Sequence, residues 1–174
     1  MIKGIIIGVF GVFIIGLIGA FCVVVFGLVP ANADARPSYL EAWMAHHALH
    51  AVLVREAPKT PNPLPLTNNN LIRGIQLYAM NCAICHGVAD GQASNIAQGL
   101  YQTPPQLSFN GVENDPPGFT YWKIYHGIRF TGMPCFRRTL TTQEIWKLCL
   151  FLKNMDRLPP KAKSFWHSLP SASH

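Results

Sequence analysis

The segment that most constrains this chain is the pentapeptide at residues 82–86, Cys-Ala-Ile-Cys-His. Two thiols separated by two residues can reach the two vinyl groups of one porphyrin, and the next residue then supplies an imidazole to the iron. A thioredoxin-like redox pair would need alternating strands and helices, and a zinc site would need a second Cys or His pair. The sequence offers neither context, because the surroundings have helical periodicity and the other cysteines stand alone. The motif therefore predicts covalent attachment of one haem c.

An uncharged apolar segment at residues 5–29 is long enough to cross a bilayer as a helix. Lys3 precedes it without any acidic residue, so the positive-inside tendency predicts a cytoplasmic N-terminus and an exported remainder. The alternative is a cleaved signal peptide with residues 31–33, Ala-Asn-Ala, as the cleavage site, although a signal's apolar region usually has only about 7–15 residues. We predict a retained anchor at residues 1–30. Its glycines would let another membrane helix approach closely, which suggests a partner membrane subunit.

Residues 31–66 are expected to form an extracytoplasmic connector. Ser38 as N-cap and Glu41 as the returning acid of a capping box predict a helix that runs to about Arg55. Its predicted apolar face consists of Leu40, Trp43, Met44, His47, Ala48, Ala51 and Val52. The helix could lie on lipid, pack on the haem domain or dock against a partner. His46 and His50 share a helix face, but no third ligand is evident, so solvated or interfacial histidines are favoured over a metal site.

The haem domain is predicted at residues 67–163, all-α, with residues 164–174 as a C-terminal tail. Helical periodicity favours helices at residues 71–82, 121–128 and 141–156, the last with a capping box at Thr141 and Glu144. Gly74 would leave a flat place for a crossing helix. Trp122 and its aromatic neighbours would offer surface to a cofactor. The turn Thr-Gly-Met-Pro at residues 131–134 presents Met133.

Residues 71–160 resemble class I cytochrome c, the small all-helical fold with one haem. The resemblance lies in Gly74, Tyr78, the haem motif, Pro-Gln-Leu at residues 105–107 and the turn that contains Met133. It implies that Cys82 and Cys85 form the thioethers, with His86 as proximal and Met133 as distal ligand. Pro105 would accept a hydrogen bond from the other imidazole nitrogen, and Gly74 and Tyr78 would cross the last helix near Trp146 and Leu150. The residues expected to bind the cofactor are Cys82, Cys85, His86, Met133, Pro105, Tyr78 and Trp122.

Two alternatives remain open around these residues. His126 is a rival for the distal position and would lower the potential, whereas thioether and imidazole together raise it. Cys135 and Cys149 could form a disulfide outside the cytoplasm, which would stabilise the fold by about 3 kcal/mol if unstrained. Otherwise they are two free thiols that behave as small hydrophobes.

Residues 66–163 carry ten Lys and Arg against five Asp and Glu, so the domain is basic. Four of the cations, Lys123, Arg129, Arg137 and Arg138, bracket the turn that contains Met133. Basic charge near a haem edge would steer an acidic redox partner. A nucleic-acid partner is not expected, because no binding motif accompanies the charge.

The flanking segments resemble those of membrane-anchored monohaem cytochromes that serve respiratory or photosynthetic complexes. By that resemblance, the chain is expected to carry single electrons on the periplasmic side of a bacterial inner membrane, as a subunit of or tether to a larger complex. It would not itself be an enzyme. Alternatives are a haem enzyme or gas sensor with an open distal position, and a structural haem subunit.

Overall fold

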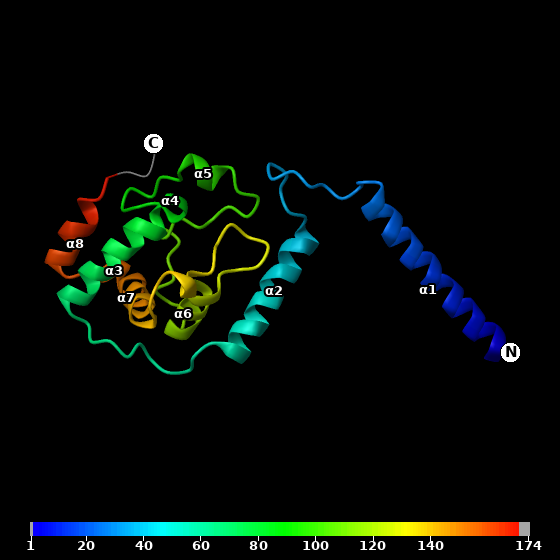
Figure 1. The fold of residues 1–174 in the computed structure, drawn as a ribbon, viewed down its shortest axis with the longest axis horizontal. Coiled ribbons are helices and arrows are strands. Elements are labelled where there is room, and N and C mark those ends of the chain that lie inside the picture. The colour runs from blue at the N-terminus through cyan, green and yellow to red at the C-terminus, as the bar shows by residue number, and fades with distance from the viewer. Residues whose placement is uncertain (1, 171–174) are drawn as a thin grey trace. The chain divides into compact units, whose positions relative to one another are not determined.

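The computed structural model describes residues 2–170, and every regular element in that range is helical (Figure 1). The chain divides into two compact units, one that ends at Ala35 and one that begins at Arg36. The first unit contains α1 (Ile2–Val25), whose 24 residues include none that is buried. By length and composition α1 could cross a membrane, although a signal sequence near an N-terminus meets the same criterion.

The second unit holds all the remaining helices. They are α2 (Tyr39–Glu56), α3 (Asn68–Asn81), α4 (Ala83–His86), α5 (Asn95–Gln98), α6 (Pro117–His126), the 3₁₀ turn η1 (Phe136–Arg138), α7 (Thr142–Lys153), the 3₁₀ turn η2 (Met155–Arg157) and α8 (Pro160–His167). The predicted helices at residues 71–82, 121–128 and 141–156 correspond to α3, α6 and α7, with shifted ends. The prediction of an all-α domain is confirmed for the described residues.

The core forms where α3 crosses α7. Gly74 makes this crossing close, since a Cβ atom there would lie 2.4 Å from the carbonyl oxygen of Lys147 and 2.9 Å from Cβ of Phe151. The crossing was predicted one residue earlier along α7, near Trp146 and Leu150. Trp146 instead stacks on Tyr121 of α6, with ring centroids 4.3 Å apart, because adjacent helix positions point about 100° apart.

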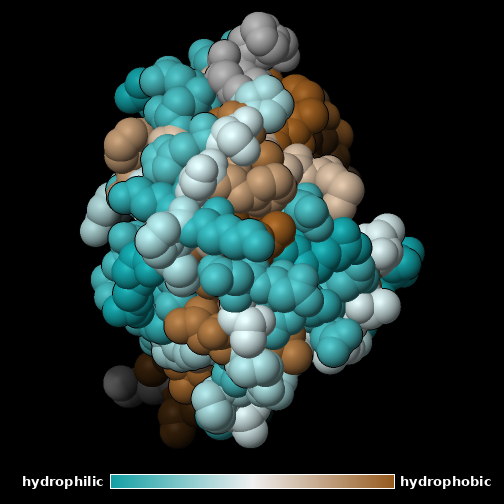
Figure 2. All heavy atoms as spheres, turned by 90° about the vertical axis from the view of Figure 1, so that its left-hand side faces the viewer, coloured by the Kyte–Doolittle hydropathy of each residue, from teal (hydrophilic) through white to brown (hydrophobic). Residues whose placement is uncertain are grey.

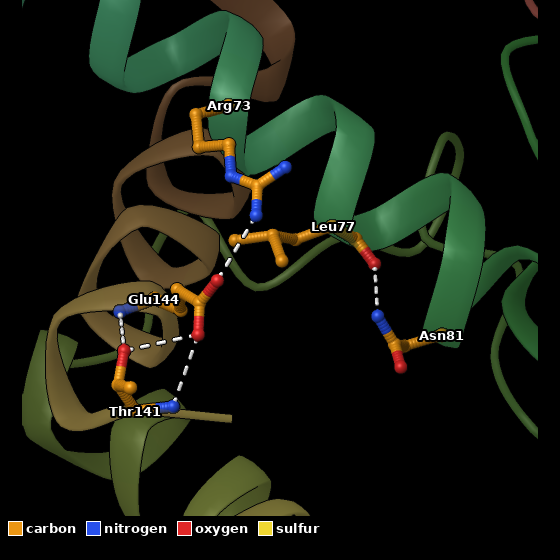
Figure 3. A network of polar contacts seen from close by, with 5 residues as sticks. All are labelled: Arg73, Leu77, Asn81, Thr141 and Glu144. Carbon is orange, nitrogen blue, oxygen red and sulfur yellow. Dashed lines mark hydrogen bonds and ion pairs between the residues drawn. The ribbon is translucent and has the colours of Figure 1, made fainter. Parts of the chain in front are cut away.

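A polar network fastens the start of α7 to α3 (Figure 3). The side chain of Thr141 accepts from the backbone N–H of Glu144, and the Glu144 carboxylate accepts from the backbone N–H of Thr141, so the predicted capping box is present. The other carboxylate oxygen accepts a hydrogen bond from Arg73 at 3.0 Å. One side chain therefore caps α7 and ties it to α3.

The chain after α7 contributes more to the core than the sequence suggested. Pro160 begins α8, and Trp166 on that helix is buried. Its ring lies edge-on to Tyr78 and Phe151, at centroid distances of 5.4 and 5.1 Å. The predicted boundary between residues 163 and 164 thus falls inside a helix, because proline at the first helical position starts a helix as readily as it stops one. Seen from the side of α8, the surface is mostly hydrophilic, with apolar residues in small patches (Figure 2).

The α2 helix belongs to the same compact unit as the core, so of the three placements left open for it the structure shows packing on the haem domain. Its buried residue is Leu53, followed by buried Ala57, and His50 lies edge-on to Phe119 of α6 at 6.2 Å. The capping box predicted here is only half formed. Ser38 accepts from the backbone N–H of Glu41, but the Glu41 carboxylate accepts from the Tyr101 hydroxyl at 2.7 Å.

The segment after α2 continues around the domain. A Cβ atom on Gly118 would lie 1.9 Å from the carbonyl oxygen of Pro58, so the chain passes directly against the start of α6. Further on, the side-chain amide of Asn62 donates to the carbonyl of Trp146 at 2.8 Å. Residues 38–62 are therefore a strap that runs across α6 and reaches α7.

Candidate haem-binding site

The two cysteines and the histidine of the motif lie on one helical turn. After α3 ends, the backbone N–H of His86 bonds to the carbonyl of Cys82 at 2.8 Å, and α4 forms a single turn. Residues at i, i+3 and i+4 share a helix face, so Cys82, Cys85 and His86 are grouped on one side. Both thiols are free. Burial, with a smaller effect of the neighbouring Cys85, raises the pKa of the Cys82 thiol to about 12.

The imidazole of His86 is oriented by a backbone carbonyl. Its Nδ1 lies 2.9 Å from the carbonyl oxygen of Pro105, which can only accept, so Nδ1 carries the proton. Burial lowers the pKa of His86 below its ordinary value, and the hydrogen bond to Pro105 opposes this only in part. The ring is therefore neutral at neutral pH, with its Nε2 lone pair available to a metal. This is the contact that the resemblance implied for Pro105.

The backbone of the motif is held from behind by Tyr78. Its hydroxyl lies 3.1 Å from the carbonyl oxygen of His86 and 2.9 Å from that of Gly87. The ring is fully buried and lies edge-on to Phe151 at 5.4 Å. Burial also raises the pKa of Tyr78. Tyr78, predicted among the cofactor-binding residues, thus uses its polar atom to position the turn that carries His86.

The loop with Pro105 adds further bonds to the same turn. The backbone N–H of Leu107 donates to the carbonyl of His86 at 3.2 Å, and the side-chain amide of Gln106 donates to the carbonyl of Cys85 at 3.1 Å. Gly87 has φ of +70°, and a Cβ atom there would lie 2.4 Å from Oε1 of Gln106. Glycine is therefore required at the point where the motif passes the loop. We call residues 82–87 and 104–107 together the histidine side of the site.

Met133 lies in residues 127–135, which we call the methionine loop. The backbone N–H of Ile128 bonds to the carbonyl of Met133 at 3.2 Å, and the N–H of Met133 bonds to Oγ1 of Thr131 at 3.1 Å. The Met133 side chain is half-buried and packs against the core cluster. Leu100, shortly after α5, supports the loop from outside. Its side chain lies directly against Gly132, since a Cβ atom on that glycine would lie 2.9 Å from the δ carbons of Leu100.

Trp122 lies in the middle of α6, and His126 is the last residue of that helix. Trp122 is half-buried, and its ring lies 4.7 Å from that of His126, which is exposed. The pKa of Glu56, the last residue of α2, is lowered first by a hydrogen bond from Arg55 and to a smaller extent by one from Trp122. The indole of Trp122 thus contacts α2, and its predicted role in cofactor binding stays a prediction. Of the two rival distal ligands, Met133 is the less exposed.

Cys135 and Cys149 form no disulfide, so the second of the two alternatives holds. The thiol of Cys135 donates to the carbonyl of Tyr125 at 3.4 Å. Cys149 is buried in α7, and this burial raises its pKa. The two sulfur atoms therefore serve local packing on separate elements.

No group of three or more His, Cys, Asp and Glu side chains suitable for a metal ion occurs among residues 2–170. His46 and His50 line an open pocket with Asp115 and Phe119. Asp115 is already paired with Lys123 at 2.8 Å.

The chain's own donor set fits a haem group. Two free thiols and a neutral imidazole with an available Nε2 share one turn, and a thioether sits in a half-buried loop of the same domain. Sequence reasoning missed the supporting role of Leu100 and assigned Tyr78 to the cofactor instead of to the turn. For Gln106 and Leu107 the Pro-Gln-Leu pattern was the signal, without indicating their bonds to the turn.

Comparison with known proteins adds one finding. Residues 69–152 match the family model described as cytochrome C oxidase, cbb3-type, subunit III. The matched segment contains α3 to most of α7, and with them both sides of the site. Comparison with curated proteins and with solved structures finds no significant match.

Proposed function

We propose, from the premise that residues 69–152 form a class I c-type cytochrome domain, that the chain carries electrons one at a time through a single covalently bound haem c. When bound, haem c supplies a one-electron iron couple. In this proposal Cys82 and Cys85 form the thioethers, and His86 and Met133 occupy the two axial positions. Filling both positions leaves no room for a substrate at the iron, so the chain acts as an electron carrier and not as an enzyme on its own.

The observation that carries this proposal is the geometry of His86. Its Nδ1 is bonded to the Pro105 carbonyl at 2.9 Å, which sets the tautomer and restrains the ring so that Nε2 is left for a metal. Cys82 and Cys85 lie on the same turn. A thioredoxin-like pair or a half zinc site has no need for an imidazole oriented in this way next to two thiols.

The ligand pair also predicts the direction in which the protein tunes the iron. A thioether beside an imidazole favours the ferrous state and raises the reduction potential relative to two imidazoles. Met133 as ligand therefore suits a carrier that receives electrons from a donor of moderate potential. His126 in its place would lower the potential.

We further propose that α1 is a retained membrane anchor and that the haem domain lies on the periplasmic side of a bacterial inner membrane. The length of α1, its lack of acidic residues and Lys3 in its first turn support this orientation. The domain would then work as a subunit of, or tether to, a larger respiratory or photosynthetic complex. The glycines along α1 leave room for a partner membrane helix.

An acidic redox protein is the partner that we propose for the surface beside the methionine loop. Arg129, Arg137 and Arg138 are exposed there, and Phe130 is 91% exposed with φ of +62°. A bulky residue in that backbone region is strained, and such strain is retained where it serves a function. Arg137→Gln is expected to slow reduction by an acidic donor protein several-fold at low salt and to have little effect at high salt, whereas Lys161→Gln on α8 is the control.

The experiment that tests the proposed ligation is an optical spectrum of the full-length holoprotein in both oxidation states. The parent is expected to show the weak near-infrared sulfur-to-iron band, and Met133→Ala is expected to lose it. Met80→Ala is the matched control, because Met80 is 65% exposed on α3 and its loss should leave the band unchanged. A high-spin parent spectrum that shifts on addition of carbon monoxide or nitric oxide would favour the enzyme or sensor alternative.

A further inference from the structure

We propose that the outer face of α2 lies in the headgroup region of the membrane, so that this helix holds the haem domain against the bilayer surface. The inference rests on the proposed role of α1 as an anchor. It concerns a helix that lies outside the matched segment at residues 69–152.

The outer face of α2 is a continuous apolar stripe. It consists of Leu40, Trp43, Met44, His47, Ala51 and Val54, all of which are exposed. Their spacing of three, four or seven residues places them along one side of the helix. The exposed fractions of the four largest apolar members are 62% for Leu40, 49% for Trp43, 51% for Met44 and 51% for Val54. The stripe contains no Asp, Glu, Lys or Arg.

The opposite face of α2 is already committed to the haem domain. Leu53 is buried there, and Glu41 accepts the hydrogen bond from Tyr101 at 2.7 Å. His50 lies against Phe119, and the chain leaves α2 through buried Ala57. The helix cannot roll its apolar stripe into the core without breaking these contacts, so the stripe must be covered from outside or stay in water.

The covalent connection to α1 favours lipid as that cover. Residues 26–38 join the two helices and span at most about 45 Å when fully extended. An anchored α1 therefore keeps α2 permanently within reach of the bilayer surface. The stripe from residue 40 to residue 54 is about 21 Å long at 1.5 Å per residue, which is enough for a helix to lie along the surface.

The residue types of the stripe suit the interface between headgroups and acyl chains. Trp and Tyr concentrate in that layer, and here Trp43 lies in the stripe while Tyr39, 86% exposed, lies at the start of the helix. The charges of α2 stay off the stripe. Glu41 is bonded to Tyr101, and Arg55 pairs with Glu56 at 2.7 Å. Lys59, which follows the helix, donates to the carbonyl of Val54, so its ammonium lies at the end of the stripe, where lipid phosphates can reach it. Embedding the stripe therefore desolvates none of the charged side chains of α2.

This placement has a mechanical consequence for electron transfer. Because α2 is packed on α6, a helix lying in the headgroup layer would fix the height and tilt of the haem domain relative to the membrane. The domain would then meet partners within the same membrane at a limited set of orientations. A domain on a free connector of this length would sample many.

The test uses the full-length holoprotein in vesicles of phosphatidylcholine that carries a photoactivatable group on an acyl chain, followed by mass spectrometry of the labelled peptides. We expect lipid adducts on α1 and on residues 39–54, with α2 labelled several-fold above the peptide that contains Phe109. Phe109 is a matched control, because it is 73% exposed in the haem domain but lies outside α2. The double variant Trp43→Gln with Met44→Gln should lose most of the labelling on α2 and keep that on α1.

Each outcome separates the inference from the proposed function. Labelling of α1 without labelling of α2 overturns the inference and leaves the anchor standing. Labelling of neither helix contradicts the anchor as well. If a chemical cross-linker added to the same vesicles joins α2 to a second copy of the chain and lipid adducts on α2 are absent, protein and not lipid covers the stripe, which also overturns the inference. The sulfur-to-iron band, measured in parent and double variant alike, confirms that both are folded around the haem.

Discussion

The histidine side and the methionine loop of the candidate site are built in different ways. The turn that carries His86 is fastened by groups from two other segments, with Tyr78 behind it and Pro105 and Leu107 beside it. The methionine loop is held mainly by bonds among its own residues, such as Ile128 to Met133. From outside the loop it is supported by the side chain of Leu100 against Gly132, by the packing of Met133 on the core and by the bond from Cys135 to the Tyr125 carbonyl.

This contrast separates two kinds of sensitivity. Opening the histidine side would break buried hydrogen bonds that also connect α3 with the Pro105 loop, so damage there is expected to lower the stability of the whole domain. Opening the methionine loop would break local bonds at an exposed turn, so damage there is expected to change ligation before it changes stability. The predictions below test this separation.

Tyr78→Phe is expected to have the largest effect on stability. The variant keeps the ring between Phe151 and Trp166 but removes the hydroxyl donor of the buried Gly87 carbonyl, whereas the His86 carbonyl keeps the N–H of Leu107. An unmet buried acceptor costs about 1–3 kcal/mol. Denaturant unfolding of the holoprotein should show a loss of that size, while the sulfur-to-iron band at neutral pH should be retained.

Tyr39→Phe is the control for this variant, because Tyr39 is 86% exposed and its hydroxyl lies at the surface. Its unfolding free energy should stay within about 0.5 kcal/mol of the parent. If Tyr78→Phe kept full stability and lost the sulfur-to-iron band, the separation between the two sides would be wrong.

Leu100→Ala is the corresponding change on the methionine side. It removes the side chain that packs against Gly132, and so it weakens the closed state of the loop without opening a large cavity, since Leu100 is only half-buried. We expect exogenous imidazole to displace Met133 several-fold faster, with a smaller loss of global stability than Tyr78→Phe causes. Stopped-flow absorbance and denaturant unfolding measure the two effects. Leu66→Ala, at a residue 59% exposed before α3, should change neither.

The histidine side was largely predictable from sequence, because its chemistry is local. The spacing of Cys82, Cys85 and His86 alone implies one helical turn, and α4 provides it. The contact between His86 and Pro105 came from a resemblance, not from any pattern within the residues themselves. The bonds from Tyr78 and Leu107 depend on how three segments meet, which no periodicity encodes.

The strap and α8 show where sequence reasoning failed, and for what reason. Periodicity in α2 correctly identified an apolar stripe, but the domain packs against the opposite side, through Leu53 and a carboxylate. A polar residue such as Glu41 carries no signal that it will bond to Tyr101. Likewise, residues 164–174 were predicted to be a tail outside the haem domain, although Trp166 lies in the core. Amphipathic patterns show that a helix has two faces, and only the tertiary structure shows which one is covered.

Thr141→Val is expected to cost about 1 kcal/mol, the usual value of an N-cap side chain. This change tests the contacts that join α7 to α3 and alters neither side of the site.

The hydrogen bonds from Thr141, first from its backbone and then from its side chain, together with Arg73, hold the pKa of Glu144 below its ordinary value of 4.5. A carboxyl group whose pKa is lower in the folded state stabilises the fold at pH values above its pKa in the unfolded state. This stabilisation is lost as the pH falls through its pKa in the folded state.

Urea unfolding at several pH values between neutrality and acid checks the sign of this effect. The difference between parent and Glu144→Gln should be present above about pH 4.5 and should shrink at lower pH. Asp156→Asn is the control, since Asp156 lies 3.8 Å from Arg157 in an exposed pair. A Glu144→Gln effect that grew as the pH fell would contradict the assigned direction.

Tyr101→Phe is expected to have the smallest effect. It tests whether the strap helps to hold the methionine loop in place. Tyr101 follows Leu100 directly, and its hydroxyl donates to Glu41 on α2. That bond also raises the pKa of Tyr101, because the neighbouring carboxylate disfavours a phenolate. The bond lies close to solvent, where water can replace the lost partner, so global stability should change little. If α2 steadies Leu100 through this bond, displacement of Met133 by imidazole should be slightly faster than in the parent and slower than in Leu100→Ala. Combining Tyr101→Phe with Glu41→Ala should then give no further acceleration, because both changes remove the same contact. Additive effects would instead mean that α2 and the methionine loop are independent, and that the strap supports the domain without influencing the distal ligand.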